Sequence, residues 1–179
     1  MPGERSQAIV QSIEEWLATL PPGTWRSRPV EIPRDDEYRF DTLLALEPAK
    51  ANACPIELGV TVPEEGSAVA LFLDTWASVA RRLGCELSPD KATRIALFLE
   101  PTPMTVERVL AACKAIVGGS VHLDAGLLGR RLVCTSGWLD TSAGRLEMHG
   151  VEDYLLPLVR TIALVGLGKV RTLPYQPWV

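Results

Sequence analysis

The sequence has few of the residues on which most catalytic and metal sites depend. It contains only two histidines and four cysteines, and the cysteines stand far apart with no Cys-x-x-Cys pair. This spacing excludes zinc-ribbon and iron–sulfur motifs. Isolated cysteines in apolar surroundings behave as small hydrophobic residues, so we expect no metal and no cofactor. Unpatterned cysteines also favour a reducing, cytoplasmic setting.

Long basic runs and long apolar runs are absent as well. No basic run exceeds two residues, and the formal net charge is −4, so we expect no nucleic-acid surface and no anionic-membrane surface. The longest apolar stretch, 155–168, is too short to span a bilayer and contains Pro157 and Arg160. Residues 1–8 are polar and hold no signal-peptide core. The sequence therefore predicts a cytoplasmic protein that does not bind membranes.

The familiar catalytic loops are incomplete. Residues 165–169 (Val-Gly-Leu-Gly-Lys) lack the third glycine and the following helix that a dinucleotide-binding loop requires. Ser136 lacks the Gly-x-Ser-x-Gly turn of a hydrolase nucleophile. Cys134 has Asp140, not arginine, six residues further on, which excludes a phosphatase loop. A cysteine–histidine pair that includes Cys134 remains open.

Apolar periodicity, by contrast, is clear along most of the chain. Helical periods cover 6–20, 67–83, 103–117 and 151–165. Strand patterns cover 24–32, 37–46, 56–62, 95–99, 121–123 and 132–135. Ser67 is the expected N-cap of the second helix, and Gly84 is its expected stop. Residues 162–165 fit a strand as well as the end of the last helix.

The order of these elements, α-β-β-β-α-β-α-β-β-α, predicts one α+β domain over residues 1–179. We expect a mostly antiparallel sheet with helices packed on one face. The alternative is a mixed sheet that includes 95–99, because a continuous apolar run is typical of a strand covered on both faces. This order resembles the layout of bacterial type III secretion chaperones over about two-thirds of the chain, a likeness of architecture that carries no residue over.

Histidine and carboxylate residues supply the first candidate site. His122 and Asp124 lie two residues apart and therefore on the same face of a strand. With Glu147 and His149 nearby, they would form a metal site or a general acid–base pair. No third metal ligand stands at a suitable spacing, which favours an ordinary polar surface.

Two glutamates at strand ends supply the second candidate site. Glu47 and Glu100 each follow an apolar strand and precede a proline. Ligands gather at the carboxyl ends of strands in open α/β sheets, so these side chains could act on a small molecule. A glutamate that simply ends a strand in solvent is the simpler interpretation.

The tryptophans are candidate contact residues. Trp16 and Trp76 fall on apolar helix faces, which predicts that they are buried. Trp25, Trp138 and Trp178 have no such pattern, and aromatic residues are enriched at protein interfaces. Trp178, near the chain end, is the best candidate anchor across an interface. The equal alternative is a tail that folds back on its own domain.

Composition and the missing motifs together favour binding over catalysis. The apolar fraction is 47% and the mean hydropathy is +0.12, which suits a chain that buries more than its own core. A compositional bias would explain these values too. We predict a protein-binding module of the adaptor, chaperone-like or immunity type, acting as a homodimer or in a complex, and an acidic surface suits a basic partner segment. The alternatives are a structural subunit, or a small enzyme or small-molecule-binding protein that uses carboxylates and histidine at strand ends.

Overall fold

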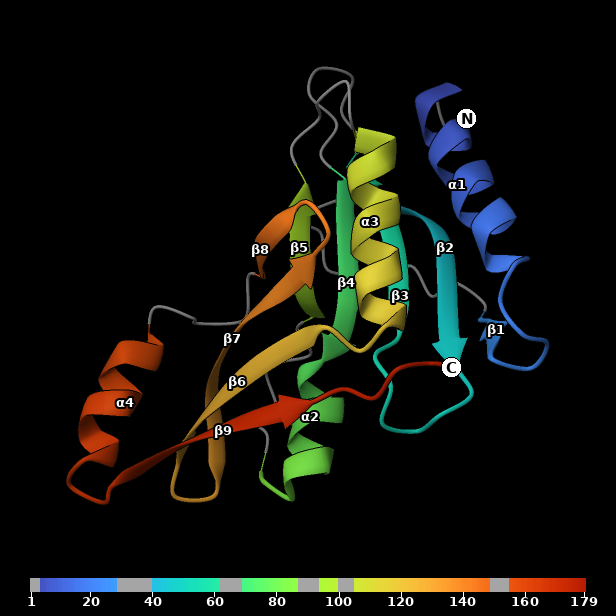
Figure 1. The fold of residues 1–179 in the computed structure, drawn as a ribbon. Coiled ribbons are helices and arrows are strands. Elements are labelled where there is room, and N and C mark those ends of the chain that lie inside the picture. The colour runs from blue at the N-terminus through green and yellow to red at the C-terminus, as the bar shows by residue number, and fades with distance from the viewer. Residues whose placement is uncertain (1–3, 29–39, 62–68, 87–93, 100–104, 149–154) are drawn as a thin grey trace.

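The computed structural model describes residues 4–28, 40–61, 69–86, 94–99, 105–148 and 155–179 (Figure 1). Its helices are α1 (Glu4–Leu17), α2 (Trp76–Leu83), α3 (Thr105–Val117) and α4 (Leu156–Ala163). Its strands are β1 (Trp25–Ser27), β2 (Phe40–Pro48), β3 (Ile56–Thr61), β4 (Val69–Thr75), β5 (Arg94–Leu99), β6 (Val121–Leu128), β7 (Arg131–Thr141), β8 (Gly144–Met148) and β9 (Gly168–Pro174). None of the helices in these ranges combines the length and the apolar character that crossing a membrane requires.

The strands form two antiparallel sheets. One has the order β1-β2-β3-β4-β5 and the other has the order β8-β7-β6-β9. The α+β class, the antiparallel pairing and the relative order of the predicted elements are therefore confirmed, and the structure adds further strands and the division into two sheets. β5 pairs antiparallel with β4, so residues 95–99 do not form the mixed sheet considered as an alternative. The short strand β1 lies at a sheet edge, as the prolines in 24–32 predict.

One hydrophobic cluster joins the helices and the two sheets. α1 and α3 lie on the same face of the first sheet, as Figure 1 shows, because their apolar stripes share this cluster with the inward residues of β2, β3 and β4. Leu123 of β6, Leu139 of β7 and Trp178 of the tail belong to it too. The two sheets therefore share one interior.

The segment before α2 is a strand, and the helix predicted to begin at Ser67 is wrong over 69–75. Every residue from Val69 to Leu73 is apolar, and β4 is hydrogen-bonded on both sides, to β3 and to β5. A central strand buried on both faces favours such a continuous apolar run. The helix begins after Thr75, whose Oγ1 accepts a 3.2 Å hydrogen bond from the Ser78 N–H. It ends at Gly84, which has φ 63°, as expected.

The second half holds more strand than the sequence predicts. β6 and β7 run well beyond 121–123 and 132–135 and meet at a turn that contains Gly129, with φ 59°. The strands β8 and β9 were not expected. α4 ends at Ala163, so 162–165 end a helix and are not a strand.

Candidate functional site

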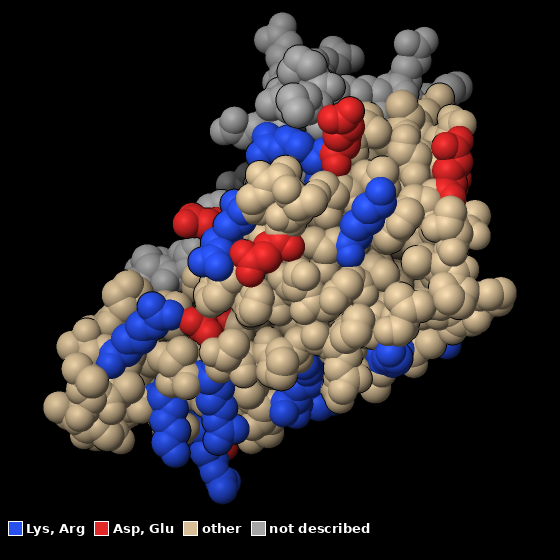
Figure 2. Space-filling model, in the orientation of Figure 1, with Lys and Arg blue, Asp and Glu red and all other residues tan. Residues whose placement is uncertain are grey.

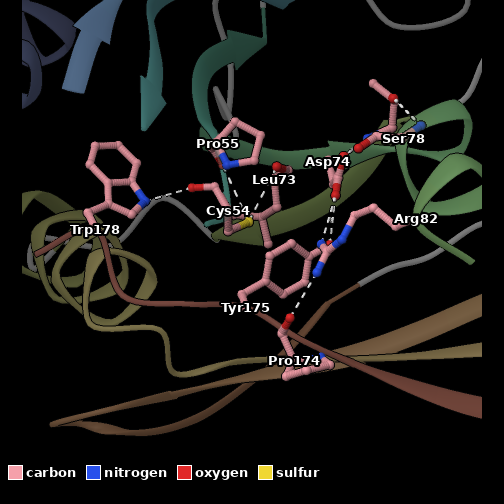
Figure 3. A network of polar contacts seen from close by, with 10 residues as sticks. Cys54, Pro55, Leu73, Asp74, Ser78, Arg82, Pro174, Tyr175 and Trp178 are labelled. Carbon is pink, nitrogen blue, oxygen red and sulfur yellow. Dashed lines mark hydrogen bonds and ion pairs between the residues drawn. The ribbon is translucent and has the colours of Figure 1, made fainter. Parts of the chain in front are cut away.

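A polar network fixes the C-terminal tail to β4 and α2 (Figure 3). The Tyr175 hydroxyl donates a 2.7 Å hydrogen bond to Oδ2 of Asp74, and both side chains are buried. Arg82 lies with its guanidinium carbon 4.4 Å from the Tyr175 ring centroid and donates a 2.8 Å hydrogen bond to the carbonyl of Pro174. Burial, followed by the nearby charges, raises the pKa of Tyr175, so the phenol stays neutral and can donate.

Trp178 belongs to the same tail and lies in the core of its own chain. It is 2% exposed, and its Nε1 donates a 2.9 Å hydrogen bond to the carbonyl of Cys54. Trp178 therefore lies as the second alternative predicted, in a tail that folds back on its own domain. Trp178 could contact a partner only if the tail detached. Trp25 and Trp16 are half-buried against the core. The Trp76 side chain lies outside the described residues.

In the structure, His122 and Asp124 each have other polar partners. Both oxygens of Asp124 accept hydrogen bonds of 2.7 Å, one from Nη2 of Arg160 in α4 and one from the hydroxyl of Thr172 in β9. Asp124 is buried, and its charge-assisted hydrogen bonds link β6 to α4 and β9.

His122 contacts a different carboxylate, which the sequence did not indicate. Its Nε2 lies 3.3 Å from Oδ2 of Asp140, and its ring stacks on Trp138 with centroids 5.0 Å apart. Arg145 donates a 3.0 Å hydrogen bond to Asp140, which lowers the pKa of that carboxyl, and lies 4.9 Å from the Trp138 ring centroid. This is a solvated cluster whose charges already pair with one another. Its members come from β6, β7 and β8, so only the strand register could have revealed it.

Of the other residues predicted for the His122 site, only Glu147 lies in the described part of the chain. Glu147 is exposed on β8, opposite Trp138 in the register. His149 and Glu100 lie outside the described residues. Within the ranges that the structure describes, no three His, Cys, Asp or Glu side chains are placed to hold a metal ion.

The four cysteines form no disulfide, and three of them are buried. Cys134 lies against Leu156 and Val159 of α4. Burial raises the pKa of Cys113 to about 12 and also raises the pKa of Cys54. These thiols are small core residues, as their isolation in the sequence predicts.

Glu47 lines a polar cleft of about 380 Å³ at the end of β2 and β3. Glu57 and Asp74, both buried, line the same cleft. Each carboxylate is close to a cation: Arg26 lies 2.6 Å from Glu47, Arg28 lies 3.1 Å from Glu57, and Arg82 lies 3.8 Å from Asp74. Glu47, predicted at a strand end, thus lies in a group of carboxylates, whose negative charge is largely neutralised by these arginines.

The most unusual surface lies at the far end of the second sheet. Five large apolar side chains are exposed there, and we call them the apolar tip: Leu128 (39%), Leu158 (57%), Leu164 (87%), Val165 (70%) and Leu167 (71%). Leu158 comes from the first turn of α4, Leu164, Val165 and Leu167 come from the turn between α4 and β9, and Leu128 ends β6. Figure 1 shows these segments together, and the pairing of Leu128 with Gly168 brings the two turns side by side. No single sequence segment contains the tip.

Local backbone structure holds the tip in place. Gly166 has φ 79°, its N–H bonds to the Ala163 carbonyl at 3.1 Å, and the Leu167 N–H bonds to the Ile162 carbonyl at 3.2 Å. This pattern is the Schellman end of a helix, in which the residue after glycine usually packs back onto the last turn. Here Leu167 stays exposed instead. The turn is therefore fixed while its side chains face solvent.

Basic side chains border the apolar tip. Arg130 and Arg131 are exposed beside the β6–β7 turn, and Lys169 and Arg171 are exposed on β9. Glu86 forms an isolated backbone β-bridge with Arg131, and its side chain adds one carboxylate. Figure 2 shows blue side chains beside an uncharged surface at the lower left, where α4 and the start of β9 lie. No basic run is present in the sequence, because strand pairing, not chain order, brings these cations together.

Comparison of the chain with protein-family models, with curated proteins and with solved structures found no match in any of the three.

Proposed function

We propose that this chain is a protein-binding module that docks a partner on the apolar tip. One observation supports the proposal above the others. Of the six large apolar side chains that are exposed among the described residues, five lie on α4, on the turn that follows it and at the end of β6. Scattered exposed apolar residues are ordinary, but a contiguous patch with a polar rim is typical of an interaction site.

The energetics of the tip suit a binding surface. Burying a leucine or valine fully contributes about 1.5–3 kcal/mol relative to leaving it exposed, so Leu164, Val165 and Leu167 alone would supply several kcal/mol. Because the Schellman turn already fixes the backbone, little further ordering would oppose binding. In this proposal the chain acts in the cytoplasm, as a single domain, bound to another protein or to a second copy.

The polar cleft supports a second candidate function, binding of a small molecule. The supporting observation is that Glu47, Glu57 and Asp74 line one cleft. The arginines beside these carboxylates weaken this candidate, because a ligand would have to compete with pairs that are already formed.

The test is a comparison of three forms of the full chain as bait in extracts of the cells that make it. Leu164→Gln with Leu167→Gln removes apolar surface from the tip, and Val179→Gln removes exposed apolar surface elsewhere. We expect the wild type and Val179→Gln to retain the same partner and the tip variant to lose it. Light scattering on the same samples identifies a partner that is a second copy. Equal retention by all three forms would contradict the proposal.

A further inference from the structure

The strand next to the apolar tip has an open edge. β9 is the last strand of its sheet and pairs only with β6. In the described part of the chain, no backbone–backbone hydrogen bond reaches residues 168–173 from outside that pairing. Arg82 closes the end of this edge by donating to the carbonyl of Pro174. The stretch from Gly168 to Leu173 therefore presents unpaired backbone groups on one side.

The side chains along this edge divide by charge. Lys169 and Arg171 are exposed on one face of β9, since residues two apart in a strand share a face. Val170 and Thr172 lie on the other face, toward α4. An added strand would thus meet two cations on one face, and an apolar and a hydroxyl side chain on the other.

We propose that the β9 edge pairs with an extended, acidic segment of the partner protein, which continues the second sheet by one strand. This inference rests on the proposed function and names the part of the partner that binds. Main-chain hydrogen bonds would hold the segment, as in other strand additions to a sheet edge. Its carboxylates, at alternate positions, would face Lys169 and Arg171, and its apolar residues would reach Val170 and Leu167 of the apolar tip.

Charge and backbone pairing argue against two other occupants of this edge, a second copy of the chain and an anionic membrane. Antiparallel pairing of β9 with β9 of a second copy, centred on Val170, would set Lys169 opposite Arg171, and like charges directly opposite in a sheet are destabilising. An anionic membrane would attract the cations, but lipid tails cannot pair with the open backbone groups of an edge strand. An acidic protein segment satisfies the charges and the backbone together.

The test uses amide NMR of the ¹⁵N-labelled full chain with three probes. The first is a capped peptide of alternating Glu and Val, the second has Lys in place of Glu, and the third is a vesicle of phosphatidylcholine with phosphatidylserine. We expect the acidic peptide to shift amides of residues 168–173 and to bind about tenfold more tightly than the basic peptide. Shifts elsewhere, equal affinity for both peptides, or binding to vesicles alone would overturn the proposal.

Charge-reversal variants separate this inference from the proposed function. Lys169→Glu with Arg171→Glu should lose the acidic peptide and gain the basic one, which an unfolded protein would not do. Lys50→Glu with Lys114→Glu makes the same change of net charge at exposed positions elsewhere and should leave the preference unchanged. If the preference does not reverse while Leu164→Gln with Leu167→Gln still loses its cellular partner, the strand pairing is wrong and the proposed function stands.

Discussion

Tyr175 is a single side chain that fixes the C-terminal tail to β4 and α2. Its hydroxyl supplies a hydrogen bond to a buried carboxylate, and its ring carries the guanidinium of Arg82. Tyr175→Phe would leave Asp74 with one partner fewer and keep the ring in place. Hydrogen bonds to charged groups contribute about 1.5–3 kcal/mol, so we expect the free energy of unfolding to fall by that amount. Urea denaturation measures it, and Val179→Ala, at an exposed position, should change it little.

The same tyrosine predicts how stability depends on pH. Burial raises the pKa of Tyr175 in the folded chain, so the folded state holds a proton that the unfolded state releases above pH ~10. The contribution is complete below that pH and is lost as pH rises further. The raised pKa values of Cys54 and Cys113 act in the same direction, from pH ~8.5 upward. We therefore expect the free energy of unfolding to decrease from pH 9 toward pH 11.

Tyr175→Phe separates the two sources of this pH dependence. The variant retains the thiol contribution and lacks the phenol contribution, so its unfolding free energy should fall less steeply above pH ~10. Parallel denaturation curves at several pH values make the comparison. An identical decrease in the wild type and the variant would show that the hydroxyl keeps an ordinary pKa.

Individual residues were only partly predictable from the sequence. The isolation of the cysteines correctly indicated small core residues, because burial of a lone thiol needs no partner. The spacing of His122 and Asp124 could not show that Arg160 and Thr172, from distant segments, hydrogen-bond to Asp124. Asp140 could not be foreseen, since its distance from His122 depends on the strand register.

At the scale of elements, the docking of α4 depends on the absence of a side chain at Gly126. A Cβ there would meet Sγ of Cys134 and would lie 3.3 Å from Cγ1 of Val159. Gly126→Ala should therefore push α4 away from the second sheet and lower the free energy of unfolding by about 1–3 kcal/mol, as overpacking does. Hydrogen exchange should show faster exchange in α4. Gly118→Ala, which lies at the end of α3, should leave α4 exchange unchanged.

Strands were predictable where apolar residues alternate with other residue types along the sequence. The alternation over 56–62 correctly gave β3, and the stop at Gly84 was correct. β4 was mistaken for a helix because an apolar run buried on both faces carries no period of two, so the helical stripe of α2 could be extended backward. β9 was missed because Val170 and Leu173 are its only large apolar residues, a pattern that a charged edge strand shares with a tail.

At the scale of the whole molecule, the distribution of charge matters more than its sum. The net charge of −4 gave no reason to expect a basic surface. Pairing of β6 with β9 nevertheless brings Arg130, Arg131, Lys169 and Arg171 to the end that carries the apolar tip. The predicted preference for a basic partner followed from the acidic total, whereas the β9 edge favours an acidic segment. Composition cannot show such a separation, because it depends on which turns meet in space.

Photo-crosslinking in the cells that express the protein tests the tip as a binding surface most directly. A benzophenone amino acid replaces Leu164, at the centre of the apolar tip, or Ser142, in the exposed β7–β8 turn. We predict a discrete covalent adduct with one partner protein from position 164 and none from position 142. Adducts from position 142 with none from position 164 would contradict the account and place the contact surface elsewhere.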